Sequence, residues 1–149
     1  MTSRTRRLSC IVLRRTKLAE QDLILTMLAA SGEEVRAVAK GARRPGGRLA
    51  SRSELFSEVD LLLAKGRGAL EVVSEATLVN AHAKIRGDFA RVSAASVVAE
   101  LACLTCLQNS EDSFLYPICS KVLACLERAC DQRQLEEVEI GRASCRERV

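Results

Sequence analysis

Residues 55–78 read LFSEVDLLLAKGRGALEVVSEATL and predict a β-hairpin. Residues 55–63 alternate in polarity, which is typical of a strand with one buried face. The positions expected to face the core are Leu55, Val59, Leu61 and Leu63. The positions expected on the opposite face are Phe56, Glu58 and Asp60. Lys65-Gly66-Arg67-Gly68 then predicts a turn into a second strand, Leu70 to Leu78, which is rich in Val and Thr.

Three more short apolar runs precede this hairpin and predict three further strands. They are Leu8 to Arg14, Asp22 to Leu28 and Glu34 to Lys40, with a turn at residues 29–32. Five strands at this spacing are typical of a small closed barrel of the oligonucleotide-binding (OB) type. We therefore expect an OB-fold barrel over residues 1–80.

From about Ala81 the apolar spacing changes to three and four residues, which predicts helices. The first helix has apolar residues around most of its circumference and is expected to be buried on most sides. Its apolar stripe comprises Phe89, Val92, Ala95, Ala99, Cys103 and Cys106, with Val98, Leu101 and Leu104 beside it. The second helix is expected to bury the stripe Phe114, Ile118, Val122, Cys125 and Ala129. Residues 81–139 are therefore expected to form a partial helical domain whose apolar faces need further partners.

The last ten residues, 140–149, read IGRASCRERV and resemble the translation of a sequencing-library adapter. We interpret them as a non-native tail and leave them out of the fold prediction. The alternative is an ordinary basic tail.

The N-terminal sequence predicts neither export nor insertion into a membrane. The apolar run Leu8 to Leu13 is too short for a signal peptide or a membrane span. We therefore expect a cytoplasmic protein whose seven cysteines are reduced thiols rather than a disulfide framework.

Positive charge is concentrated in the first half of the chain. Residues 1–68 hold 14 Lys and Arg against 7 Asp and Glu, a balance of +7, whereas residues 69–149 hold 9 against 12, a balance of −3. Five cations fall within thirteen residues of the segment AVAKGARRPGGRLASRS at 37–53: Lys40, Arg43, Arg44, Arg48 and Arg52. Such a cluster can bind a polynucleotide backbone by releasing its condensed counterions. The alternative is a solvated, charged loop.

The same segment does not fit a nucleotide-binding P-loop. Gly41 and Gly46 have the required spacing, but Gly47 and Arg48 occupy the Lys and Ser/Thr positions, and Pro45 removes a backbone donor. Base stacking is also unpromising, because Phe56 is the only aromatic residue in the barrel segment. We therefore expect contacts with the nucleic-acid backbone to dominate.

No catalytic or metal-binding constellation is evident. Cys103 and Cys106 have zinc-ligand spacing but no second pair at a similar spacing, so core packing is the favoured interpretation. His82, the only histidine, stands at a predicted strand-to-helix junction and is expected to be structural. We expect a protein that is not an enzyme and has no cofactor or metal.

Four stretches resemble the RecO family of bacterial DNA repair proteins, over about residues 8–130. They are IVLR at 11–14, AEQD at 19–22 followed by ILT at 24–26, VAKGARRP at 38–45, and LLL at 61–63 with GRG at 66–68. VAKGARRP is the most specific of them. The resemblance implies an N-terminal OB barrel followed by a helical domain that often carries a four-cysteine zinc site.

The resemblance also implies a function. Members of the family bind single- and double-stranded DNA and anneal complementary strands. With the partner RecR they help RecA to load on DNA that is coated by single-strand-binding protein, and they use no nucleotide. Carried over by position, Lys40, Arg43, Arg44 and Arg48 are expected to touch DNA, with Arg14, Arg15 and Lys17 as further candidates.

Two features depart from the family pattern. Leu18-Ala19 replaces a usual Tyr-Gly, which affects the expected turn geometry, and the later helices and zinc cysteines have no counterpart in this sequence. We therefore expect no zinc site, and incomplete contact with the tail of single-strand-binding protein. The alternative functions are a generic OB-fold module that binds RNA or the ribosome, and a scaffold that binds proteins only.

Overall fold

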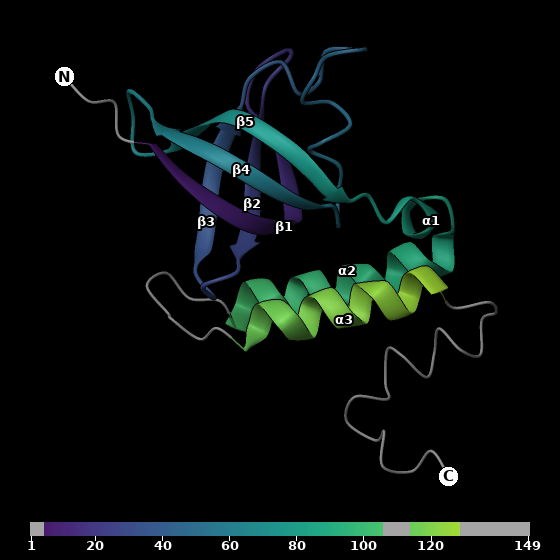
Figure 1. The fold of residues 1–149 in the computed structure, drawn as a ribbon. Helices are drawn as coiled ribbons and strands as arrows, with labels where there is room; N and C mark the ends of the chain where they lie inside the picture. Colours follow the sequence, from purple (N-terminus) through teal and green to yellow (C-terminus); the bar gives the residue numbers. More distant parts are fainter. Residues whose placement is uncertain (1–4, 106–113, 129–149) are drawn as a thin grey trace, which may run out of the picture.

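The computed structural model describes residues 5–105 and 114–128 and contains a five-stranded barrel followed by three helices (Figure 1). The strands are β1 (Thr5–Lys17), β2 (Leu23–Ala29), β3 (Glu34–Ala39), β4 (Glu58–Lys65) and β5 (Glu71–Asn80). They close in the order β1-β2-β3-β5-β4. The predicted OB-type barrel with following helices is therefore confirmed.

The barrel interior follows from the alternation of residues along each strand. In β2 and β3 every second residue is apolar and buried, because successive side chains of a strand point to opposite faces. These residues are Leu23, Leu25, Met27, Ala29, Val35, Ala37 and Ala39. Small alanines on β3 oppose large side chains elsewhere in the core, which lets a narrow barrel fill its interior.

The barrel closes along a short parallel contact between β3 and β5. Only Ala37 with Glu71 and Val38 with Val72 are paired there among the described residues. Beyond Val72, β5 continues to Asn80 while pairing with β4 on its other side. Its β3-facing edge therefore runs past the closure without a partner strand in the part of the chain that the structure describes.

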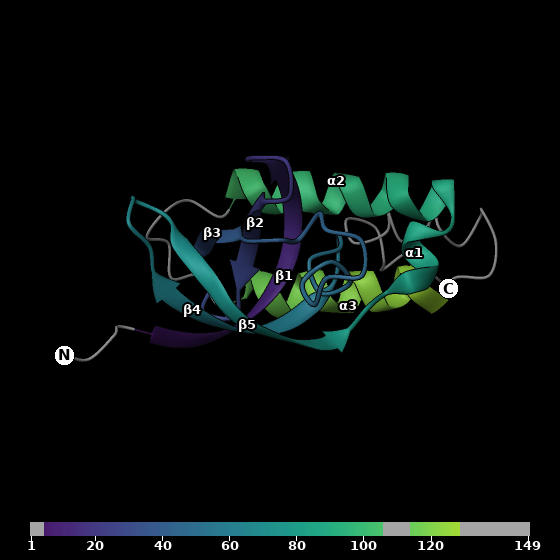
Figure 2. The same ribbon diagram turned by 90° about the horizontal axis from the view of Figure 1, so that it is seen from above.

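The helices cover one end of the barrel. They are α1 (Ala83–Arg86), α2 (Phe89–Thr105) and α3 (Leu115–Arg128), and α2 and α3 run side by side beneath the strands (Figures 1 and 2). Alanines at 94, 95, 99 and 102 form much of the buried face of α2, so α3 can approach closely. Ile11, Leu13, Leu28 and Phe56 from the barrel side complete this second core.

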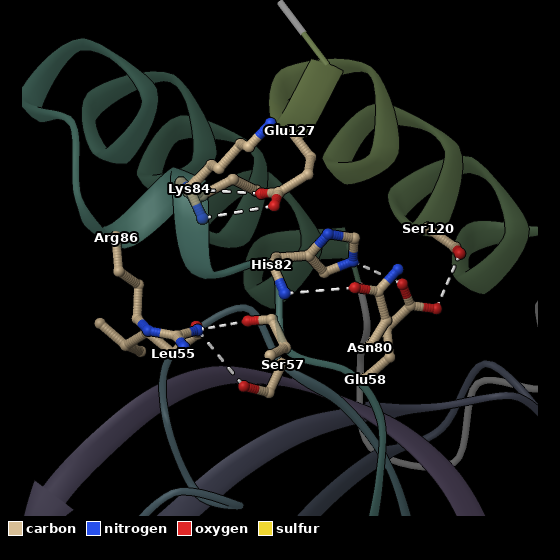
Figure 3. A network of polar contacts seen from close by, with 11 residues as sticks. Leu55, Ser57, Glu58, Asn80, His82, Lys84, Arg86, Ser120 and Glu127 are labelled. Carbon is tan, nitrogen blue, oxygen red and sulfur yellow. Dashed lines mark hydrogen bonds and ion pairs between the residues drawn. The ribbon is translucent and has the colours of Figure 1, made fainter.

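A network of polar contacts joins the barrel to the helices (Figure 3). His82, just before α1, places its Nε2 2.6 Å from Glu58 Oε2 of β4, and Ser120 of α3 donates to Glu58 Oε1 at 2.8 Å. Both oxygens of Glu127 accept backbone N–H groups of α1, from Lys84 at 3.3 Å and from Ile85 at 3.2 Å. His82, which was expected to be structural, thus contacts the buried carboxylate of Glu58.

The predicted strand over residues 55–63 was wrong at its start. β4 begins at Glu58, and Phe56 has a positive φ of 67°, which turns the chain before the strand. Phe56 and Glu58 were expected on the less buried face, but their exposed fractions are 2% and 9%. The reason is that α1 and α3 pack against this end of the barrel, so both faces are covered.

The predicted buried stripes of the helices were also partly wrong. On α2, Phe89 is 87% exposed and Leu104 is 74% exposed, so this helix is not buried around most of its circumference. Next to and within α3, Phe114 and Ile118 are 77% and 51% exposed, and the buried residues are Cys119, Val122, Leu123 and Leu126. Each helix contacts the barrel or its neighbour on one side only. Cys106 and Ala129 lie outside the described residues.

Candidate nucleic-acid interface

The connection from β3 to β4, residues 40–57, is named here the basic loop, and the turn between β1 and β2 fixes its start. Asp22 Oδ1 accepts the backbone N–H of Gly41 at 2.9 Å, and the carbonyl of Gln21 accepts that of Arg43 at 2.9 Å. The turn itself closes through Leu18 N donating to Asp22 O at 3.1 Å. The segments AEQD and VAKGARRP are therefore in direct contact.

Successive turns then give the basic loop a defined course. The N–H groups of Arg44, Gly47 and Ala50 each donate to the carbonyl three residues earlier, at 3.0, 3.0 and 3.2 Å. Gly41 and Gly46 have φ values of +73° and +76°, which side chains with a Cβ rarely adopt. The glycines and the successive turns therefore determine the course of the loop backbone that carries the Lys and Arg side chains.

Four of the five loop cations line one groove, named here the basic groove. It has a volume of about 1030 Å³ and lies between the basic loop and the edge of β5 that has passed β3. The cations on its loop side are Lys40, Arg44, Arg48 and Arg52. Its other wall is β5 from Val73 to Leu78, including the exposed Ser74 and Thr77.

The charge of the four cations is available for an external anion. Across residues 5–105 and 114–128, none of them forms an ion pair, whereas Arg6, Arg15 and Arg86 do. Arg44 donates from Nη2 to Oε1 of Gln21 at 3.3 Å, and this amide partner is neutral. Among the described residues, Glu75 is the only acidic one that lines the basic groove, which leaves a formal lining charge of +3 from four cations and one anion. This excess favours an anionic ligand, such as a polyanion, over a cationic or neutral one.

The other predicted contact residues lie elsewhere. Arg43 turns away from the groove and donates from Nη1 to the carbonyl of Ala19 at 3.1 Å. Arg14 borders a smaller groove of about 410 Å³ between β1–β3 and α2, together with Glu34, Arg36 and Glu100. Arg15 is half-buried beside Glu54, at 3.8 Å, and Lys17 ends β1 as an exposed side chain. The structure thus brings together only part of the predicted set.

Sequence reasoning missed the β5 wall of the basic groove. Ser74, Glu75 and Thr77 were assigned to a strand without a site role, and their polarity carries no specific functional pattern. What places them in the site is the short β3–β5 closure, which only the three-dimensional pairing reveals.

The described residues show no cluster of three or more His, Cys, Asp or Glu side chains placed to hold a metal ion. Cys103 is half-buried on α2, and burial raises its pKa. Its expected zinc-spaced neighbour, Cys106, lies outside the described residues. Within the same described ranges, no helix has the length and apolar character that a bilayer span requires.

Comparison with known proteins identifies the family of the barrel. A family model described as "Recombination protein O N terminal" matches residues 1–82, which include the barrel and the basic loop. The chain is 48% identical over 91 residues to the DNA repair protein RecO of Bifidobacterium longum subsp. infantis, covering 60% of this chain and 38% of the relative. It is 34% identical over 125 residues to the DNA repair protein RecO of Synechococcus elongatus, covering 84% of this chain and 47% of the relative. The chain spans less than half of the length of these relatives, and through its barrel it belongs to the RecO family of DNA repair proteins.

Proposed function

We propose that this chain binds DNA through the basic groove and acts in recombinational DNA repair. The observation that carries the proposal is the convergence of Lys40, Arg44, Arg48 and Arg52, free of ion pairs with described residues, on one groove. In the wider function implied by its family, the chain anneals complementary strands of DNA. With RecR it helps RecA to load on DNA that is coated by single-strand-binding protein, without nucleotide hydrolysis and without making or breaking a covalent bond.

Binding to the groove is expected to depend steeply on salt. Four phosphate contacts on a single strand, at about 0.7 each, give a slope of roughly −3 for log affinity against log salt concentration. Replacing Arg44 and Arg48 together by alanine removes two contacts and should flatten the slope by about 1.4. Because phosphate contacts carry little base information, affinity should fall by a similar factor for all sequences. Fluorescence anisotropy with labelled oligonucleotides at several salt concentrations measures both quantities.

Arg43→Ala is the matched control, because Arg43 is an exposed arginine of the same loop that points to Ala19 instead of the groove. It should change the slope by much less than one groove cation does. A folded Arg44→Ala/Arg48→Ala protein with the wild-type slope would contradict the proposal and leave the basic loop as a solvated surface.

RNA binding is the competing function, because the cations would contact either backbone. The groove lining contains hydroxyls on Ser51, Ser74 and Thr77, which do not by themselves discriminate a ribose 2′-OH. Equal strands of DNA and RNA compared in the same assay decide between the two. A clear preference for RNA would favour the ribosome- or RNA-binding module.

A further inference from the structure

We infer that the basic groove holds a single strand by its sugar-phosphate backbone and leaves the bases outside, free to pair with a complementary strand. This inference rests on the proposed DNA binding and adds the orientation of the bound strand. It gives a physical reason why one protein can both retain a strand and permit its annealing.

The chemistry of the two groove walls carries the orientation. One wall presents the cations Lys40, Arg44, Arg48 and Arg52, and the other presents the exposed side chains of Ser74 and Thr77. The β5 edge behind these hydroxyls has no partner strand on its β3 side among the described residues, so backbone polar groups also border the groove. Charged and hydrogen-bonding atoms on both sides match the phosphate and sugar of a strand.

The groove offers no ring on which a base could stack. Its lining residues include no Phe, Tyr or Trp. The chain has only four aromatic residues. Phe56, the one in the barrel segment, is 2% exposed and packed into the core between the barrel and the helices. Proteins that capture unpaired bases use stacking on aromatic side chains, worth about 1–3 kcal/mol per base.

The apolar residues that line the groove do not replace such a ring. Val73 and Ala76 are 5% and 7% exposed, and they belong to the barrel core together with the adjoining Leu49. Leu78, at the end of the β5 wall, is 37% exposed, but its side chain is aliphatic and offers no ring. The exposed aromatic residues among those described, Phe89 at the start of α2 and Phe114 just before α3, do not line the groove. Bases directed into the groove would therefore lose water without gaining a stacking partner.

Two measurements on the full 149-residue chain test the orientation. The first compares the affinities of a mixed-sequence oligonucleotide and an abasic strand of equal length, which should agree within about threefold because both carry the same phosphates. The second measures permanganate oxidation of thymines, which should proceed at the same rate in the bound strand as in the free strand. Protection of thymines, or an abasic strand bound more than tenfold weaker, would overturn the inference.

A designed variant shows that the assay can detect captured bases. Thr77→Trp places a ring on the β5 wall and should strengthen binding of the normal strand by at least about fivefold, protect thymines, and leave the abasic strand unaffected. Ser93→Trp, at an exposed position of α2, is the matched control and should change none of these. If Thr77→Trp changes the binding of neither the normal nor the abasic strand, the strand does not pass along β5, and the inference is wrong.

The outcomes separate this inference from the proposed function. If neither strand binds with a salt-dependent affinity, DNA binding itself fails. If the strand binds with the expected slope but its thymines are protected, DNA binding stands and the orientation is wrong. Restoration of thymine reactivity by Phe89→Ala or Phe114→Ala would then identify the helices as the place where bases are held.

Discussion

At the scale of single residues, burial determines whether a side chain can take part in chemistry. Cys10 lies on β1 with an exposed fraction of 0%, and desolvation raises its pKa to about 12. Since the thiolate is the reactive form of cysteine, this thiol is both inaccessible and protonated at neutral pH. Cys125, on α3, is exposed.

We expect iodoacetamide at pH 8 to leave Cys10 unmodified in the folded protein while Cys125 reacts. In denaturant the two cysteines should react at similar rates, because burial no longer distinguishes them. Peptide mapping by mass spectrometry measures each site separately. Modification of Cys10 in the folded chain at a rate within tenfold of that of Cys125 would show that the barrel opens readily at β1.

At the scale of elements, the β4–β5 hairpin depends on one close approach. A Cβ added at Gly66 would lie 2.6 Å from the carbonyl oxygen of Leu70, which is backbone and cannot move aside alone. Gly66→Ala should therefore destabilise the protein by about 1–3 kcal/mol, the usual cost of overpacking. The free energy of unfolding in urea is the measurement.

Gly68 provides the control within the same turn. A Cβ there would meet no atom within 4 Å, and its φ is not in the left-handed region, so Gly68→Ala should change stability by less than about 0.5 kcal/mol. Equal effects of the two substitutions would mean that the contact with the Leu70 carbonyl does not determine the cost.

The strands were predictable from the sequence because their signal is local. Alternation along β2 and β3 and the glycines near the β4–β5 turn are visible within a few residues. The burial of Phe56 and of the helix stripes was not predictable in this way, because it depends on which distant segment packs against them. One wall of the basic groove was predictable, because the cations of the basic loop form a cluster in the sequence. The opposing wall of β5 was not predictable, because it depends on how β5 pairs with its neighbouring strands.

At the scale of the whole molecule, Glu58 is a polar link between the barrel and the helices. Its two carboxylate oxygens contact His82 and Ser120, which belong to the junction and to α3 (Figure 3). His82 Nδ1 has no hydrogen-bond partner within the described structure, so the bond of Nε2 to Glu58 is the ring's only hydrogen bond among the described residues.

Glu58→Ala should lower the free energy of unfolding by about 2–4 kcal/mol, because it leaves the His82 ring and the Ser120 hydroxyl without their acceptor. Ser120→Ala removes a single hydrogen bond and should cost about 1 kcal/mol. Glu100→Ala, at an exposed position of α2, serves as the control and should have little effect. Urea denaturation followed by circular dichroism gives the three values. A cost for Glu58→Ala no larger than that of the control would show that the helices are held by apolar packing alone.

The short parallel closure between β3 and β5 has a mechanical consequence. A barrel under mechanical tension is expected to open first between the two strands that share the fewest paired residues. β3 and β5 share two residue pairs, whereas every other pair of neighbouring strands forms a longer antiparallel ladder. The rupture line would begin at one end of the basic groove. A DNA strand under tension in that groove would therefore pull on the β3–β5 pairing, which is expected to open while the antiparallel pairs of the barrel stay formed.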